Sequence, residues 1–154
     1  MIHKFFDQFP NLHPLLVHFP IALLLFAVLT QFSVLFFPKS QSLKWFTFAL
    51  LLSGCIGAFA AVQTAVHISG DADDKAFDIF ETHRQLGQLT QWFSLAASLI
   101  RLVTIKWFHK MWLEFILSLL ILSTGIVVTI AGHHGAQLVY IYNVGPQGEK
   151  LMSK

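Results

Sequence analysis

Residues 11–25 read NLHPLLVHFPIALLL, and this stretch decides how the rest of the chain is interpreted. It places His13, Pro14, His18 and Pro20 at the start of a long apolar run. An ionisable side chain at the entrance to hydrocarbon is costly and usually serves a function. Pro20 lies either inside a helix that begins near Pro14 or in the first turn of a helix that begins just before it, and both disturb the backbone beside His18. We therefore expect a site here rather than a plain membrane span.

The composition is that of an integral membrane protein. The chain has 154 residues, of which 55% are hydrophobic and 12% charged, and its mean hydropathy is +0.65. A soluble domain carries about 25% charged residues. The net charge of +2 comes without a dense basic cluster, which argues against nucleic acid as a partner. Cys55 is the one cysteine, so the chain has no internal disulfide framework.

Four segments approach the roughly 20 apolar residues that a helix needs to cross a bilayer. They cover about 15–37, 43–66, 86–105 and 111–131. The first and third connections are short, which predicts antiparallel neighbours. We expect an all-α, up-down-up-down four-helix transmembrane bundle that forms one domain over 1–154. The tail after Gly132 is expected to lie outside the hydrocarbon, with 138–142 as a short strand or an interfacial segment.

The basic residues predict the orientation of this bundle. They gather at the end that carries the two short connections, as Lys39, Lys44, Arg101, Lys106 and Lys110. By the positive-inside rule this end is cytoplasmic. Both termini and the acidic connection 67–81 then face outward, to the periplasm if the chain belongs to the inner membrane of a bacterium. Arg101 is expected to extend its charge to the membrane surface.

Antiparallel threading collects six of the eight histidines in one layer at the outer end. The 3.6-residue period predicts which of them face inward. On the last helix, His133 continues a stripe of small residues through Gly125 and Thr129, whereas His134 lies on a more lipid-facing stripe. Each helix then offers one inward histidine. The predicted ligands are His18, His67, His83 and His133, with His13 and His134 as secondary candidates.

Four inward histidines suit three interpretations. They can ligate the iron of one or two b-type haems, with small residues such as Gly87 and Gly125 making room for the porphyrin. They can instead bind zinc, copper or non-haem iron directly. They can also be interfacial polar groups in a structural or assembly protein without a cofactor. Covalent c-type haem is excluded, because the chain has no CxxCH motif.

The opening stretch and three further motifs carry a family resemblance. Residues 13–22, the His83–Gly87 stretch HRQLG, and the Gly132–Gly135 stretch GHHG followed by Leu138-Val139-Tyr140 resemble a bacterial family of predicted four-helix membrane proteins, domain of unknown function 2231. The likeness covers nearly the whole chain. The resemblance implies an association with redox proteins, because some relatives are joined to Rieske-type or cytochrome-like domains. The family often has a histidine and a glycine where this chain has Tyr142 and Asn143.

These observations lead to one functional prediction with two alternatives. We expect a b-type cytochrome of the bacterial inner membrane, which passes electrons from quinol as a carrier or a quinol-linked oxidoreductase. The expected partners are the lipid bilayer, quinone and a periplasmic electron-transfer protein, and a homo-oligomer is compatible with the sequence. The alternatives are a metal-binding or metal-transfer protein that uses the same histidines, and a cofactor-free structural protein.

Overall fold

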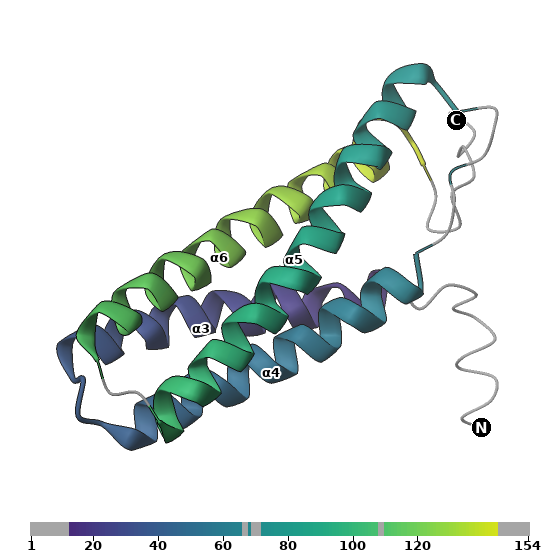
Figure 1. Cartoon of the computed structure of the whole chain (residues 1–154). Helices are drawn as coiled ribbons and strands as arrows, with labels where there is room; N and C mark the ends of the chain where they lie inside the picture. Colours follow the sequence, from purple (N-terminus) through teal and green to yellow (C-terminus); the bar gives the residue numbers. More distant parts are fainter. Residues whose placement is uncertain (1–12, 66–67, 69–71, 108–109, 145–154) are drawn as a thin grey trace, which may run out of the picture.

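The computed structural model describes residues 13–65, 68, 72–107 and 110–144, and these residues are helical with short connections (Figure 1). A short helix α2 (His13–Leu16) precedes four long ones. These are α3 (His18–Phe36), α4 (Gln41–Gln63), α5 (Asp74–Lys106) and α6 (Met111–Tyr140). The all-α prediction is confirmed.

Local sequence signals set the helix boundaries. Ser40 caps α4 by accepting a hydrogen bond from the backbone N–H of Leu43 at 3.4 Å, and Asp73 caps α5 by accepting one from Lys75 at 3.0 Å. Pro20 falls in the first turn of α3, where a missing N–H costs nothing, so the second of the two placements predicted for this proline is correct. Only Val17, whose dihedral angles are helical (φ −65°, ψ −28°), lies between α2 and α3, so the chain runs from His13 into α3 with little change of course.

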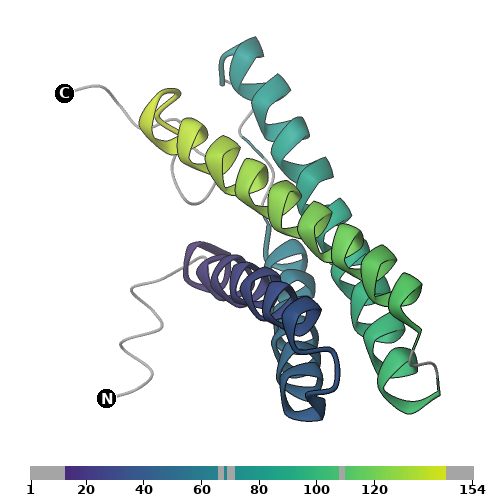
Figure 2. The same ribbon diagram turned by 90° about the vertical axis from the view of Figure 1, so that its left-hand side faces the viewer.

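The four long helices pack in a ring, in which each contacts two neighbours: α3 with α4, α4 with α5, α5 with α6, and α6 with α3. Consecutive helices run antiparallel, and the α3–α4 pair is inclined to the α5–α6 pair (Figures 1 and 2). The α3–α4 and α5–α6 connections meet at one end of the ring, which we call the short-loop end. The opposite end carries His13, His18, His83, His133 and His134, and we call it the histidine end.

Small residues let the helices approach closely. A Cβ added at Gly54 of α4 would lie 2.7 Å from Leu24 of α3, and one added at Gly125 of α6 would lie 2.7 Å from Val28. Close backbone approach at glycine is the usual way that helices associate in membranes. The space beside these glycines is therefore filled by neighbouring side chains.

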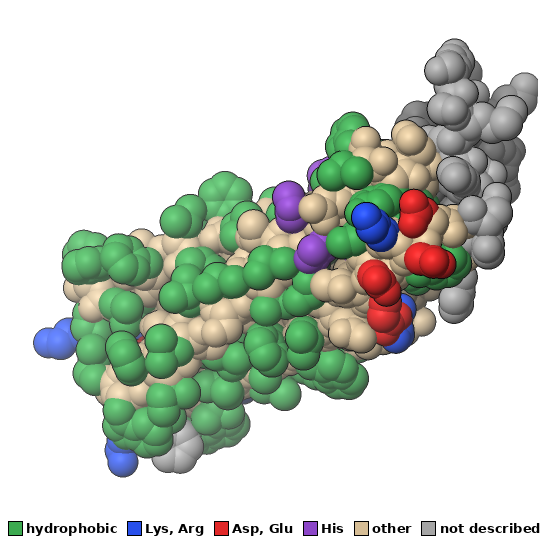
Figure 3. Space-filling view, turned by 90° about the horizontal axis from the view of Figure 1, so that it is seen from above, with side chains coloured by type: hydrophobic (Ala, Val, Ile, Leu, Met, Phe, Trp, Pro, Cys, Tyr) green, Lys and Arg blue, Asp and Glu red, His purple; other side chains and the backbone are tan. Residues whose placement is uncertain are grey.

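The outside of the ring is apolar, as Figure 3 shows for one face. Within the described residues, the segments His13–Phe36, Gln41–Gln63 and Met111–Tyr140 are long and apolar enough to cross a membrane. Helix α5 does not reach this threshold because its polar side chains are numerous. Between residues 86 and 105, the polar side chains of Gln91, Ser94 and Arg101 are buried, whereas Leu89, Trp92, Leu99 and Val103 face outward. This part of α5 is thus polar inside and apolar outside, and most of the charged residues of 74–85 are exposed.

Helices α5 and α6 are longer than predicted at the histidine end. Helix α5 begins at Asp74 rather than near 86, and α6 continues to Tyr140, so the strand is wrong as one of the two alternatives predicted for 138–142, and the interfacial segment stays a prediction. With 33 residues, α5 is about 50 Å long, well beyond the roughly 30 Å of bilayer hydrocarbon. The extensions pack on each other through a small apolar cluster of Ile68, Ala76, Leu138 and Val144.

Candidate functional site

Two histidines face each other at the histidine end. The ring centroids of His13 and His83 are 6.2 Å apart and their planes are nearly perpendicular, at 87°. His13 Nδ1–H donates to the carbonyl of Ala61 near the end of α4 at 2.7 Å. His83 Nδ1–H donates to the carbonyl of Ala131 on α6 at 2.8 Å. Four helices, α2, α4, α5 and α6, therefore position this pair.

These backbone hydrogen bonds resemble the support that metal-ligating histidines receive. Donation from one ring nitrogen to a carbonyl fixes the tautomer and the ring orientation, and presents the other nitrogen to a metal. Two metal–nitrogen bonds of about 2 Å, with two ring radii of about 1 Å, span about 6 Å. The observed separation of 6.2 Å suits one metal ion between the rings.

Helix α6 packs closely against the His83 ring. A Cβ added at Gly135 would lie 3.0 Å from His83 Cε1, so a larger residue here would press the ring away by a few tenths of an ångström. Burial lowers the pKa of His83, the hydrogen bond to Ala131 opposes this, and the nearby rings of His13 and His134 lower the pKa further. His83 is therefore held as the neutral imidazole that a metal requires.

The remaining predicted ligands are placed differently. His18 and His133 are exposed, and His18 Nδ1 donates to the carbonyl of Pro14 at 2.8 Å. His134, predicted to face lipid, is half-buried beside His83, and its Nδ1 lies 2.9 Å from the amide oxygen of Gln137. The predicted facing of His133 and His134 is thus reversed. His67 lies outside the described residues, so its ligation stays a prediction.

Among the residues that the structure places, no group of three or more histidine, cysteine, aspartate or glutamate side chains is arranged to hold a metal ion. The candidate ligands that the structure brings together at the histidine end are therefore the pair His13 and His83. On the face seen in Figure 3, histidine side chains lie between the hydrophobic side chains that cover most of the molecule and a group of Asp and Glu side chains.

A buried charge cluster lies near the short-loop end, and sequence reasoning missed it. Glu114 of α6 accepts hydrogen bonds from Arg101 Nη1 of α5 at 2.8 and 3.0 Å. Lys44 Nζ of α4 lies 3.1 Å from the same carboxylate. Gln31 of α3 bonds the carboxylate through its amide nitrogen and Arg101 through its amide oxygen. All four long helices therefore meet in this cluster.

The burial of this cluster corrects two predictions. The side chain of Arg101 is fully buried, so it does not extend to the membrane surface. Lys44 and Arg101 belong to the interior rather than to the loops, which leaves Lys39, Lys106 and Lys110 as the exposed basic residues of the short-loop end. The signal that reveals the cluster is Glu114, an acid inside an otherwise apolar span.

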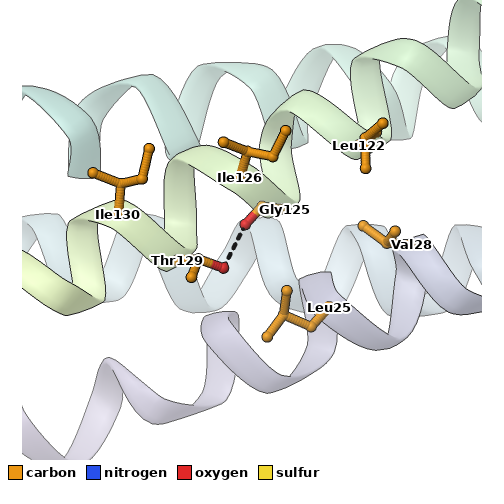
Figure 4. Close-up of a pocket in the computed structure, with 7 residues that line it drawn as sticks. All are labelled: Leu25, Val28, Leu122, Gly125, Ile126, Thr129 and Ile130. Carbon is orange, nitrogen blue, oxygen red and sulfur yellow. Dashed lines mark hydrogen bonds between the residues drawn. The ribbon is translucent and has the colours of Figure 1, made fainter.

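A groove of about 280 Å³ lies between α3 and α6, and Figure 4 shows its lining. The lining is apolar apart from Thr129, whose hydroxyl donates to the carbonyl of Gly125 at 2.8 Å. It contains no titratable or metal-ligating group. The groove is thus separate from both polar clusters.

The fold and these two clusters define a class: an α-helical membrane protein with a histidine pair at one end and a buried ion cluster near the other. The chain belongs to the family described as predicted membrane proteins (DUF2231), whose model matches residues 10–148. Comparison with curated proteins and with solved structures finds no match.

Proposed function

We propose that this membrane protein crosses the bilayer four times, with its short-loop end in the cytoplasm of a bacterium and its histidine end in the periplasm. The outward apolar face of α5 supports the fourth crossing, because Leu89, Trp92, Leu99 and Val103 would otherwise face water. The exposed Lys39, Lys106 and Lys110 support the orientation.

We propose further that the protein is a redox carrier that holds haem b through His13 and His83. The observation that carries this proposal is the facing pair itself, supported by backbone carbonyls on both sides. Two protein ligands are what bis-histidine haem iron takes, whereas structural zinc takes four and catalytic zinc three. Haem bound in this way supplies a one-electron centre without an open iron position.

The donor set fits haem, whereas the interior glycines do not supply room for a porphyrin. The positions beside Gly54 and Gly125 are filled by Leu24 and Val28, and a Cβ at Gly87 would lie 3.8 Å from Val62. This packing favours a second candidate, a bare copper, zinc or non-haem iron ion, because an ion between the two rings needs no such room. The haem and bare-ion candidates share the ligands His13 and His83 and differ only in the group that these ligands hold.

Each residue of the site has a defined task in both cases. The carbonyls of Ala61 and Ala131 fix the tautomers and orientations of the two rings. Gly135 admits the His83 ring against α6, which shields that ring from water. The proposed electron source is quinol, a reductant dissolved in the bilayer. The proposed electron acceptor is a periplasmic electron-transfer protein that docks at the histidine end.

The absorption spectrum and metal content of the protein, purified in mild detergent, separate the candidates. We expect a Soret band and an α band that sharpens on reduction. If the protein instead contains one equivalent of copper, zinc or iron and lacks these bands, the bound group is a bare ion rather than haem. A protein that is colourless and metal-free, even after expression with added haem precursor and metals, overturns both candidates.

A further inference from the structure

The inward face of α5 carries a column of polar side chains. Below the level of His83 it presents the buried Gln91, Ser94, Ser98 and Arg101. Spacings of three and four residues keep these side chains on one face of the helix. From His83 to Arg101 the column rises about 27 Å, close to the thickness of bilayer hydrocarbon. The lower end of the column is the buried charge cluster, and its uppermost buried member, Gln91, lies about 12 Å along α5 from His83.

A column of hydroxyl groups is not by itself evidence of a path for water or protons. Ser94 Oγ donates to the carbonyl of Gln91 at 3.0 Å, and Ser98 Oγ donates to the carbonyl of Ser94 at 2.7 Å. Serines in membrane helices commonly bond their own backbone in this way. A second observation is needed, and the atoms at the two ends of the serine pair provide it.

Two buried polar atoms in the described part of the chain lack a hydrogen-bond partner, and both belong to this column. They are Oε1 of Gln91, a residue 7% exposed, and Nε of Arg101, a residue 0% exposed. They lie above and below Ser94 and Ser98. Buried polar groups in folded proteins are paired, and internal water is the usual partner when no side chain is. The serine oxygens between them can accept further hydrogen bonds.

We propose that the inward face of α5 carries a chain of internal waters from the histidine end to Arg101, and that protons exchange along it between the aqueous phase and the Glu114 cluster. Only protons move, and no electron is transferred. Two cations, Lys44 and Arg101, surround the single carboxylate of Glu114. Their surplus positive charge repels protons, so the path ends at the cluster instead of crossing the membrane.

The native Cys55 reports on this path. Its thiol lies beside Ser94 at the middle of the column, and the residue is 3% exposed. Because it is the only cysteine, its S–H stretch is the only such infrared band of the protein, and Cys55→Ala confirms the assignment by removing it. The test transfers the full-length protein in lipid nanodiscs into D2O and follows the replacement of S–H by S–D.

If water fills the column, the thiol hydrogen of Cys55 should be replaced by deuterium within minutes. The double variant Gln91→Met/Ser98→Ala keeps the side-chain volumes nearly constant, and we expect it to slow the exchange by about tenfold or more. Ser123→Ala is the matched control, because Ser123 is exposed on α6 and bonds its own helix in the same manner; it should exchange like the wild type.

Two results overturn the proposal. One is a wild-type thiol that keeps its proton as long as the slowest backbone amides. The other is a double variant that elutes as the folded protein and exchanges as fast as the wild type. Neither measurement depends on the group that the histidine pair holds.

Discussion

Glu114→Gln tests the buried charge cluster most sharply. The substitution preserves the size of the side chain and removes the carboxylate that pairs with both Arg101 and Lys44, whose side chains are 0% and 4% exposed. Removal of one partner from a buried ion pair costs about 3–5 kcal/mol, because the remaining charge is left uncompensated. Here two cations lose their counter-charge, so we expect the upper part of this range.

Lys44→Met should destabilise the protein much less than Glu114→Gln, because it leaves the charges of the cluster balanced. Without Lys44, Arg101 and Glu114 still form a neutral pair, and methionine fills the apolar path of the lysine stem. We expect a loss below about 1.5 kcal/mol, the net value of one hydrogen bond. Glu81→Gln is the control, because Glu81 and Arg84 form an exposed pair, and no measurable change is expected.

The assay is reversible unfolding in mixed micelles with increasing SDS, followed by tryptophan fluorescence and circular dichroism. The predicted order of destabilisation is Glu114→Gln, then Lys44→Met, then Glu81→Gln. A Glu114→Gln variant as stable as the wild type, or a Lys44→Met variant less stable than Glu114→Gln, would refute the cluster as described.

Two further predictions concern pH and packing. The lowered pKa of His83 means that the folded state binds fewer protons than the unfolded state, so stability should fall as pH drops below about 6.5, the ordinary histidine value. Thermal melts at pH 8 and pH 5.5 should show this loss, and His83→Gln should reduce it; an unchanged difference in the variant argues against His83 as its source. Gly54→Ala places a methyl 2.7 Å from Leu24 and should cost about 1–3 kcal/mol, whereas Gly87→Ala, with its nearest neighbour at 3.8 Å, should be tolerated. Equal stability of the two glycine variants in the SDS assay would contradict the close packing of α3 and α4.

Sequence reasoning found the spans best where the pattern was simplest. The predicted 15–37 and 43–66 correspond to α3 (His18–Phe36) and α4 (Gln41–Gln63). The first three turns of α5 were missed, because 74–85 is polar and a search for apolar runs cannot detect a helix that leaves the hydrocarbon. The end of α6 was missed for a related reason, since the β-branched and aromatic residues before Tyr140 indicated a strand.

The reversed facing of His133 and His134 follows from helix geometry. A step of four residues overshoots a full turn by about 40°, so two steps from the buried Gly125 bring His133 about 80° toward the outside. The buried positions of α6 alternate steps of three and four through Val128 and Ala131, and this alternation continues through Gly135 to Leu138, so His134 lies closer to the buried face than His133. The pairing of His13 with His83 depends on how α2 packs on α4, which brings the His13 ring to His83 of α5 and which no local pattern encodes.

The stoichiometry of cofactor in histidine variants tests the central claim most directly. The measurement is haem and metal content per chain of the wild type, His13→Ala, His83→Ala and His133→Ala, purified in parallel in mild detergent. We expect about one group per chain in the wild type and in His133→Ala, and a loss of at least about tenfold in His13→Ala and in His83→Ala, because each removes one of the two proposed ligands. Full retention in either of these two variants, or loss only in His133→Ala, would contradict the His13–His83 pair as the ligand set.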